Sequence, residues 1–97
     1  MIYDISEIQR RLEPVFRERG VKSAVLFGSY SNGEADEGSD IDLLVDSGLR
    51  GFSFFGLVEY ISEALDNKEV DVFDVTQLKP GSRMASEIMK SGVRIYG

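Results

Sequence analysis

Hydrophobic and polar residues alternate along this chain at spacings that predict both helices and strands. After a capping sequence that begins at Asp4, apolar side chains recur every three or four residues and predict a helix over residues 4–18. Pro14 lies inside this segment. Because proline lacks an amide hydrogen and clashes one turn back, we expect a kink or a break between Leu12 and Val15.

The rest of the pattern predicts short strands separated by two further helices. Apolar runs predict strands over residues 22–27, 40–46, 69–74 and 93–96. Amphipathic spacing predicts a helix over residues 54–65 that Ser53 caps, and another over residues 82–91 that Gly92 ends. This order is typical of an α/β (α+β) fold, a small mixed β-sheet with helices packed on one face. No repeat or linker interrupts it, so we expect a single domain over residues 1–97.

The second strand carries an unusual pair of carboxylates, Asp40 and Asp42. Side chains alternate along a strand, so both emerge on one face with Cβ atoms roughly 6–7 Å apart, a distance that one divalent cation can bridge. Without a cation the two charges repel by roughly 2–3 kcal/mol at an effective dielectric constant near 20. Asp71 in the third strand can supply a third carboxylate on that face, with Asp74 as its rival. Three such groups would permit a two-metal site for phosphoryl or nucleotidyl transfer.

The turn after the first strand supplies a candidate phosphate site, Gly28-Ser29. If the first two strands pair as antiparallel neighbours, this turn lies beside Asp40 and Asp42. A glycine lets a phosphate approach the backbone closely, and a serine hydroxyl with the amides that follow it can cradle a polyphosphate. The two halves together predict a nucleotide site.

Composition narrows the chemistry and the partners. The 97 residues include no His and no Cys, which excludes imidazole bases, thiol nucleophiles and soft metal sites. Oxygen ligands alone favour magnesium or manganese. With 11 basic and 17 acidic residues the net charge is −6, opposite to that of a nucleic-acid binder, so we expect no direct binding of DNA or RNA. No apolar run suggests a signal peptide or a membrane span, and we expect a cytoplasmic protein.

The order of these motifs resembles the minimal nucleotidyltransferase domain of the DNA polymerase beta superfamily. Gly28-Ser29, ten intervening residues, Asp40-x-Asp42 and the later Asp71 follow its pattern, and the resemblance covers nearly the whole chain. It implies a nucleotidyltransferase fold, two magnesium ions held by Asp40, Asp42 and Asp71, and ATP contacted by Gly28 and Ser29. It also implies that Asp71 lies nearest the acceptor hydroxyl and helps to deprotonate it.

In its small size the chain resembles the MntA-type antitoxins of HEPN/MNT toxin–antitoxin pairs. That resemblance implies transfer of AMP from ATP to a tyrosine of a HEPN-domain ribonuclease toxin, which would be the partner. Two alternatives stay open. The chain could be a non-catalytic antitoxin that blocks its toxin by occlusion, or a nucleotidyltransferase acting on a cationic small molecule such as an aminoglycoside.

The sequence departs from the family pattern at one position. Members commonly carry a basic residue shortly after the Gly-Ser pair, where this chain has Asn32. Asparagine can hydrogen-bond a phosphate but cannot neutralise it, so we assign Asn32 to the nucleotide site without the usual charge. Four basic residues elsewhere could substitute, and the sequence does not choose among them: Lys22, Arg50, Lys79 and Arg83.

Overall fold

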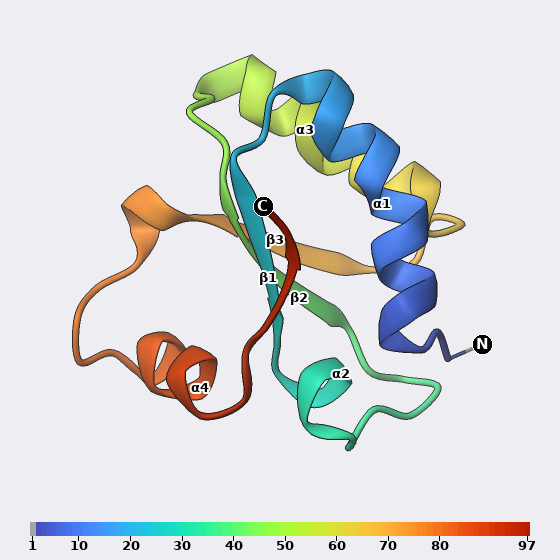
Figure 1. Ribbon diagram of the computed structural model, residues 1–97, viewed down its shortest axis with the longest axis vertical. Coiled ribbons are helices and arrows are strands. Elements are labelled where there is room, and N and C mark those ends of the chain that lie inside the picture. The colour runs from blue at the N-terminus through green and yellow to red at the C-terminus, as the bar shows by residue number, and fades with distance from the viewer. Residues whose placement is uncertain (1) are drawn as a thin grey trace.

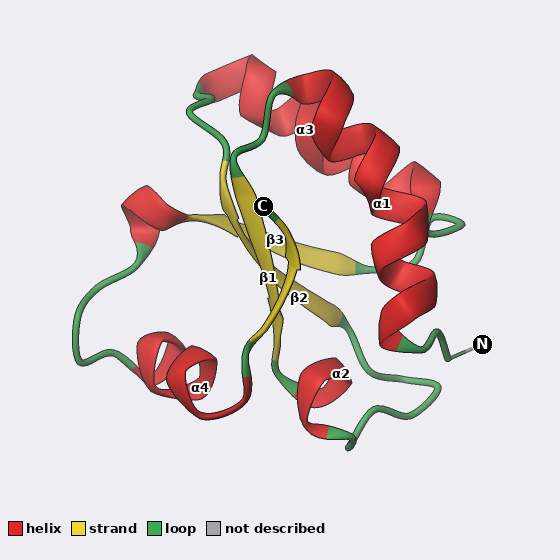
Figure 2. Cartoon of the chain, viewed as in Figure 1, coloured by secondary structure: helices red, strands yellow, loops and turns green. Residues whose placement is uncertain are grey.

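The computed structural model describes residues 2–97 and contains a four-stranded mixed sheet with its helices in two layers (Figures 1 and 2). The strand order is β3-β2-β1-β4, in which β2 and β3 are parallel and the other two pairs are antiparallel. The predicted α/β fold class is confirmed, and the bounds of the four strands differ from the expected ones by one residue at most. The elements are α1 (Ile5–Arg19), β1 (Ser23–Phe27), α2 (Ser29–Asn32), β2 (Ile41–Asp46), α3 (Gly51–Ala64), β3 (Val70–Asp74), the 3-10 turn η1 (Val75–Gln77), α4 (Arg83–Ser91) and β4 (Val93–Tyr96).

The helices α1 and α3 cover one face of the sheet and enclose the hydrophobic core (Figure 1). Because side chains alternate along β2, Ile41, Leu43 and Val45 all point to this face, where they are fully buried. The helical spacing that the sequence showed supplies their partners from α1 and α3: Ile8, Leu12, Phe16, Leu57 and Ile61.

The opposite face carries a smaller apolar strip, and α4 lies on that side. The rings of Phe27 and Phe73 are 6.2 Å apart across this face. At the end of α4, a Cβ atom added to Gly92 would lie 3.1 Å from Val25 Cγ1, so this end of the helix closely approaches β1. The expectation that helices pack on one face therefore holds for α1 and α3, whereas α4 covers the second apolar strip.

Two details of the helices differ from the sequence expectation. We expected a kink or a break at Pro14, and the break is wrong, since α1 runs from Ile5 to Arg19 as one helix. Pro14 is on the exposed side, where water can satisfy the carbonyl that its missing amide leaves without a donor. The Ser53 cap is also wrong. The helix α3 starts at Gly51, because the Arg50 carbonyl already accepts the first helical amides.

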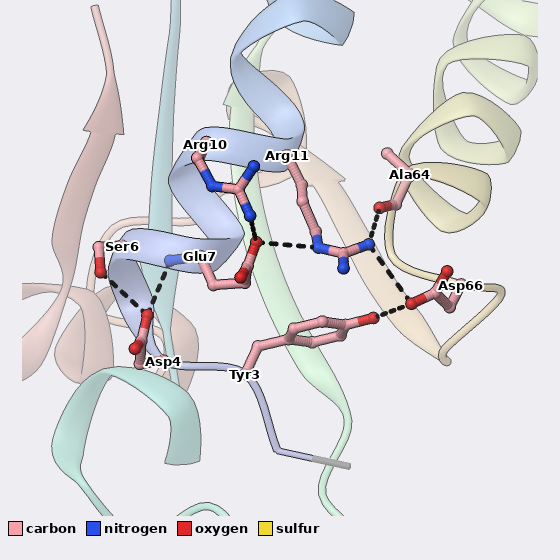
Figure 3. A network of polar contacts seen from close by, with 8 residues as sticks. All are labelled: Tyr3, Asp4, Ser6, Glu7, Arg10, Arg11, Ala64 and Asp66. Atoms are coloured by element: carbon pink, nitrogen blue, oxygen red, sulfur yellow. Dashed lines mark hydrogen bonds and ion pairs between the residues drawn. The ribbon is translucent and has the colours of Figure 1, made fainter.

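A polar network ties the start of α1 to the end of α3 (Figure 3). The Tyr3 hydroxyl donates to Asp66 Oδ2 at 2.6 Å, and Arg11 Nη1 donates to the same carboxylate at 3.3 Å and to the Ala64 carbonyl at 3.2 Å. Asp66 has a left-handed backbone conformation with φ of 57°, which a non-glycine residue adopts only at a cost. The network holds this turn in place and so fixes where the chain enters β3.

Candidate functional site

Asp42 and Asp71 lie directly opposite each other in the parallel pairing of β2 and β3. On its other side Asp42 pairs with Phe27 of β1, so the three residues form one row across the sheet. The row lies on the face that α1 and α3 leave open, because Ile41 and Leu43 on either side of Asp42 point into the core. The structure thus brings Asp42 and Asp71 together. Asp40, which lies just before β2, is exposed beside them.

The environment of Asp42 disfavours a negative charge. Burial, followed by the charges of Asp71, Asp40 and Glu87, raises the pKa of Asp42 from 3.8 to about 6. In its protonated form the carboxyl group shares a hydrogen bond with Asp71. Glu87 on α4 therefore adds to the negative charge around Asp42, although sequence reasoning missed it.

These carboxylates suit a hard divalent cation in chemistry, but they do not form a finished metal cluster. Within residues 2–97, no three acidic, His or Cys side chains are arranged around one point as metal ligands. Asp40 and Asp71 are both exposed, so water solvates their carboxylates when no cation is bound. The raised pKa of Asp42 fits a cation at this place, since a positive charge would remove the repulsion. The residues that would hold it are Asp42 and Asp71, with Asp40 adjacent.

Gly28 packs closely against Asp42, in a backbone conformation that favours glycine. Its φ of 76° lies in the left-handed region, and a Cβ atom added there would lie 2.4 Å from Asp42 Oδ2. The antiparallel pairing of β1 and β2 produces this contact, as expected from the sequence. The Gly-Ser turn and the aspartate pair are therefore parts of one site.

A pocket of about 410 Å³ opens beside this turn. Asn32 lies at the end of the single turn of α2, and its Oδ1 accepts from the amide of Glu34 at 3.0 Å, which leaves the side-chain NH₂ as the group that can bind a ligand. Sequence reasoning missed the contribution of α4, because nothing in its amphipathic pattern indicates that it lies beside β1. The residues lining the pocket are Gly28, Ser29, Asn32, Glu34, Glu87, Lys90 and Ser91.

Asp74, the rival of Asp71, has a structural role. It is buried and accepts hydrogen bonds from the amide and hydroxyl of Ser47 at 3.1 and 2.6 Å, and from those of Thr76 at 3.1 and 2.8 Å. Burial opposes its ionisation, but these hydrogen bonds outweigh burial and hold the pKa of Asp74 below its usual value. Asp74 thereby caps the turn η1, which the sequence pattern did not indicate.

Of the basic residues considered from the sequence, two lie far from this pocket. Lys22 precedes β1, at the opposite end of that strand from Gly28, and its amide donates to the Asp46 carbonyl at 2.8 Å. Arg50 lines a separate pocket of about 380 Å³ that also includes Asp74. Arg83 is on α4, where its Nε lies 3.7 Å from Glu87 Oε1.

Comparison with known proteins gives a consistent family assignment. Residues 10–97 match the family described as Polymerase beta, Nucleotidyltransferase. A putative protein adenylyltransferase of Methanocaldococcus jannaschii is 43% identical over 79 residues, which are 79% of this chain and 84% of that protein. The protein adenylyltransferase MntA of Thermococcus cleftensis is 42% identical over 84 residues, 80% of this chain and 81% of that protein.

Solved structures share the fold. The crystal structure of a toxin–antitoxin complex with AMP-PNP superposes with a TM-score of 0.75 at 25% identity, covering 92% of this chain and 73% of that one. A complex of a tri-AMPylated Shewanella oneidensis HEPN toxin with an MNT antitoxin gives 0.69 at 22% identity, covering 95% and 71%. Among residues 2–97, no helix combines the length and the apolar character that crossing a membrane requires. Because the family match extends over residues 10–97 and two relatives exceed 40% identity over most of the chain, the protein belongs to the polymerase beta nucleotidyltransferase family.

Proposed function

We propose that this protein is an adenylyltransferase that transfers AMP from ATP to a hydroxyl group of a partner protein and thereby acts as an antitoxin. The observation that carries the proposal is the contact between Gly28 and Asp42, which joins a phosphate-binding turn to the aspartate pair Asp42 and Asp71. The names of the M. jannaschii and T. cleftensis relatives support the reaction. The toxin–antitoxin complexes of the same fold, one of which contains an AMPylated HEPN toxin, support a HEPN-domain toxin as the partner that receives AMP. A tyrosine as the acceptor is our proposal from the family resemblance. We place the reaction in the cytoplasm, where ATP is available.

The metal requirement is part of this proposal. We assign Asp40, Asp42 and Asp71 to two magnesium ions, with manganese as the alternative, because the donor set is made of hard oxygen ligands only. Bound ions would neutralise the triphosphate and the charge that develops on its oxygens during transfer. Asp42, half-buried and crowded by acidic neighbours, gains most from such neutralisation.

The proposed roles follow from burial and position. The acceptor hydroxyl oxygen forms a bond to the α-phosphorus of ATP as the bond to the pyrophosphate oxygen breaks, and pyrophosphate leaves. Asp71 is exposed next to Asp42, so it can receive the hydroxyl proton from a side chain presented by another protein. Gly28 leaves room for phosphate against the backbone, and Ser29 and Asn32 offer hydrogen-bond donors in the same pocket.

A transfer assay tests the reaction. Purified protein, magnesium, ATP labelled on its α-phosphate and the HEPN-domain protein are incubated, and label on the partner is measured. We expect wild-type protein to label the partner, and Asp42→Asn and Asp71→Asn each to reduce the rate by at least roughly 100-fold. Asp46→Asn is the matched control, because Asp46 is on the same strand and the same face as Asp42, four residues away. If wild-type protein transfers no label, the proposed reaction is wrong.

The neutral Asn32 in the nucleotide pocket favours one competing function, an antitoxin that only occludes its toxin. Cell survival separates the two functions. If the double variant Asp42→Asn with Asp71→Asn still protects cells that express the toxin, then protection comes from binding alone.

A further inference from the structure

We propose that Lys90 of α4 supplies the positive charge that binds the triphosphate of ATP. This inference rests on the proposed function, and it names a binding residue that the local sequence motifs do not contain. Lys90 lines the pocket of about 410 Å³ together with Gly28, Ser29 and Asn32. A volume of that size lies within the usual range of small-molecule sites.

The charge of the pocket shows why a cation is needed. Besides Lys90, its ionisable lining residues are Glu34 and Glu87, and the charge of Glu87 also reaches Asp42. A triphosphate would meet repulsion from all of these carboxylates unless positive groups offset it. Lys90 is the one Lys or Arg that lines this pocket within residues 2–97.

The polar residues on the other side of the pocket cannot replace Lys90. Asn32 is neutral, and its Oδ1 is already occupied by the amide of Glu34. Ser29 can donate one hydroxyl hydrogen but carries no charge. A lysine ammonium group offers three donors on a flexible stem, which suits contact with phosphate oxygens.

The packing of α4 against the sheet fixes the backbone position of Lys90. Two residues after Lys90, Gly92 ends the helix with its amide donating to the Ile88 carbonyl at 2.8 Å. A Cβ atom on Gly92 would lie 2.5 Å from that carbonyl oxygen and 3.1 Å from Val25 Cγ1, so this end of the helix is pressed against β1. The last turn of α4 therefore holds Lys90 near β1, the strand that Gly28 follows.

The position of Lys90 also leaves it available. The described part of the chain contains no ion pair with Lys90, whereas Arg83, seven residues earlier on the same helix, lies 3.7 Å from Glu87. The ammonium group of Lys90 is therefore available to a ligand.

Equilibrium binding of ATP and of AMP, with magnesium present, tests the proposal directly. Because AMP lacks the β- and γ-phosphates, Lys90→Gln should weaken ATP binding by roughly 10-fold and AMP binding by less than about 2-fold. Lys90→Arg should keep ATP affinity within about 3-fold of wild type. Lys22→Gln is the matched control for loss of one positive charge, since Lys22 lies at the far end of β1, and it should bind ATP normally.

A second-site variant separates a charge effect from damage to the helix. Asn32→Arg places a new cation in the same pocket, so Asn32→Arg combined with Lys90→Gln should recover most of the lost ATP affinity. Normal ATP binding by Lys90→Gln, or an equal loss for ATP and AMP, would overturn the assignment. ATP binding without transfer by the wild-type protein would contradict the proposed function alone, whereas absence of ATP binding by the wild-type protein would reject both.

Discussion

Replacing Asp42 with asparagine should stabilise the metal-free protein, even though Asp42 belongs to the candidate site. Burial, together with the charges of Asp71, Asp40 and Glu87, raises the pKa of this carboxyl group from 3.8 to about 6. At full strength that displacement corresponds to roughly 3 kcal/mol. Because Asp42 is only half-buried and water screens its neighbours, we reduce the expected gain in unfolding free energy to roughly 1–2 kcal/mol.

The sign of the pH dependence follows from the direction of the shift. The folded pKa lies above the unfolded one, so between about pH 4 and pH 6 the folded protein binds more protons than the unfolded chain. The contribution of Asp42 to the unfolding free energy therefore falls as pH rises through this window, and it stays at its lower value above pH 6. Asparagine does not titrate, and the variant should lose this part of the pH dependence.

Thermal unfolding with a chelator, at several pH values from 4.5 to 7.5, measures both effects. For a domain of this size about 1 kcal/mol changes Tm by roughly 4–8 °C, so Asp42→Asn should melt several degrees above wild type at pH 7.5 and only slightly above it at pH 4.5. Adding magnesium should raise the Tm of the wild type more than that of the variant. Asp46→Asn provides the control on the same strand. An equal or lower Tm for Asp42→Asn at pH 7.5, or parallel pH profiles, would refute the reasoning.

Three further substitutions test the supports of the site by urea unfolding. Gly28→Ala should lower the unfolding free energy by roughly 2–4 kcal/mol, because it combines a left-handed φ with a Cβ 2.4 Å from Asp42 Oδ2. Gly38→Ala is its control, since the new Cβ makes only an ordinary 3.6 Å contact. Similar losses for both variants would contradict the close-contact argument. Asp74→Asn should lower the unfolding free energy by roughly 1.5–3 kcal/mol at neutral pH, since the ionised carboxylate accepts hydrogen bonds from Ser47 and Thr76. This loss should shrink as pH falls below 3.8, where the carboxylate becomes protonated. A loss that does not depend on pH would contradict the role given to the ionised carboxylate. Tyr3→Phe removes the hydrogen bond to Asp66 and should cost roughly 1–2 kcal/mol, whereas Tyr60→Phe, whose ring stacks under Arg19, should change stability by less than about 0.5 kcal/mol.

The sequence predicted the features that depend on local order. Alternation in residues 40–46 identified β2 and the face that carries Asp42, and the Gly28-Ser29 turn was expected to lie beside it. These predictions succeeded because the strand period and the antiparallel pairing of neighbouring strands leave few alternatives. The catalytic and metal-binding roles of Asp40, Asp42 and Asp71 remain predictions.

Features that depend on contacts distant in sequence were not predictable. The approach of Gly92 to Val25 brings Glu87 and Lys90 to the pocket, and it joins segments almost seventy residues apart. The continuity of α1 through Pro14 was missed because we expected any proline inside the segment to distort it, although the buried Leu12 and Phe16 place residue 14 on the opposite, exposed side of the helix. The start of α3 at Gly51 was missed because the Arg50 backbone, with no side-chain cap, begins the helix.

The strand β3 is at the border of the sheet, and this limits what kind of acceptor the protein can serve. Asp71 is consequently reachable from the rim of the molecule, without passage through a walled channel. A flexible segment of a large macromolecule can present its side chain there, while a small metabolite would find few surfaces to hold it in place. Selectivity would then be decided by how the whole partner docks around that rim, and the same docking would have to shield the reacting atoms from competing water.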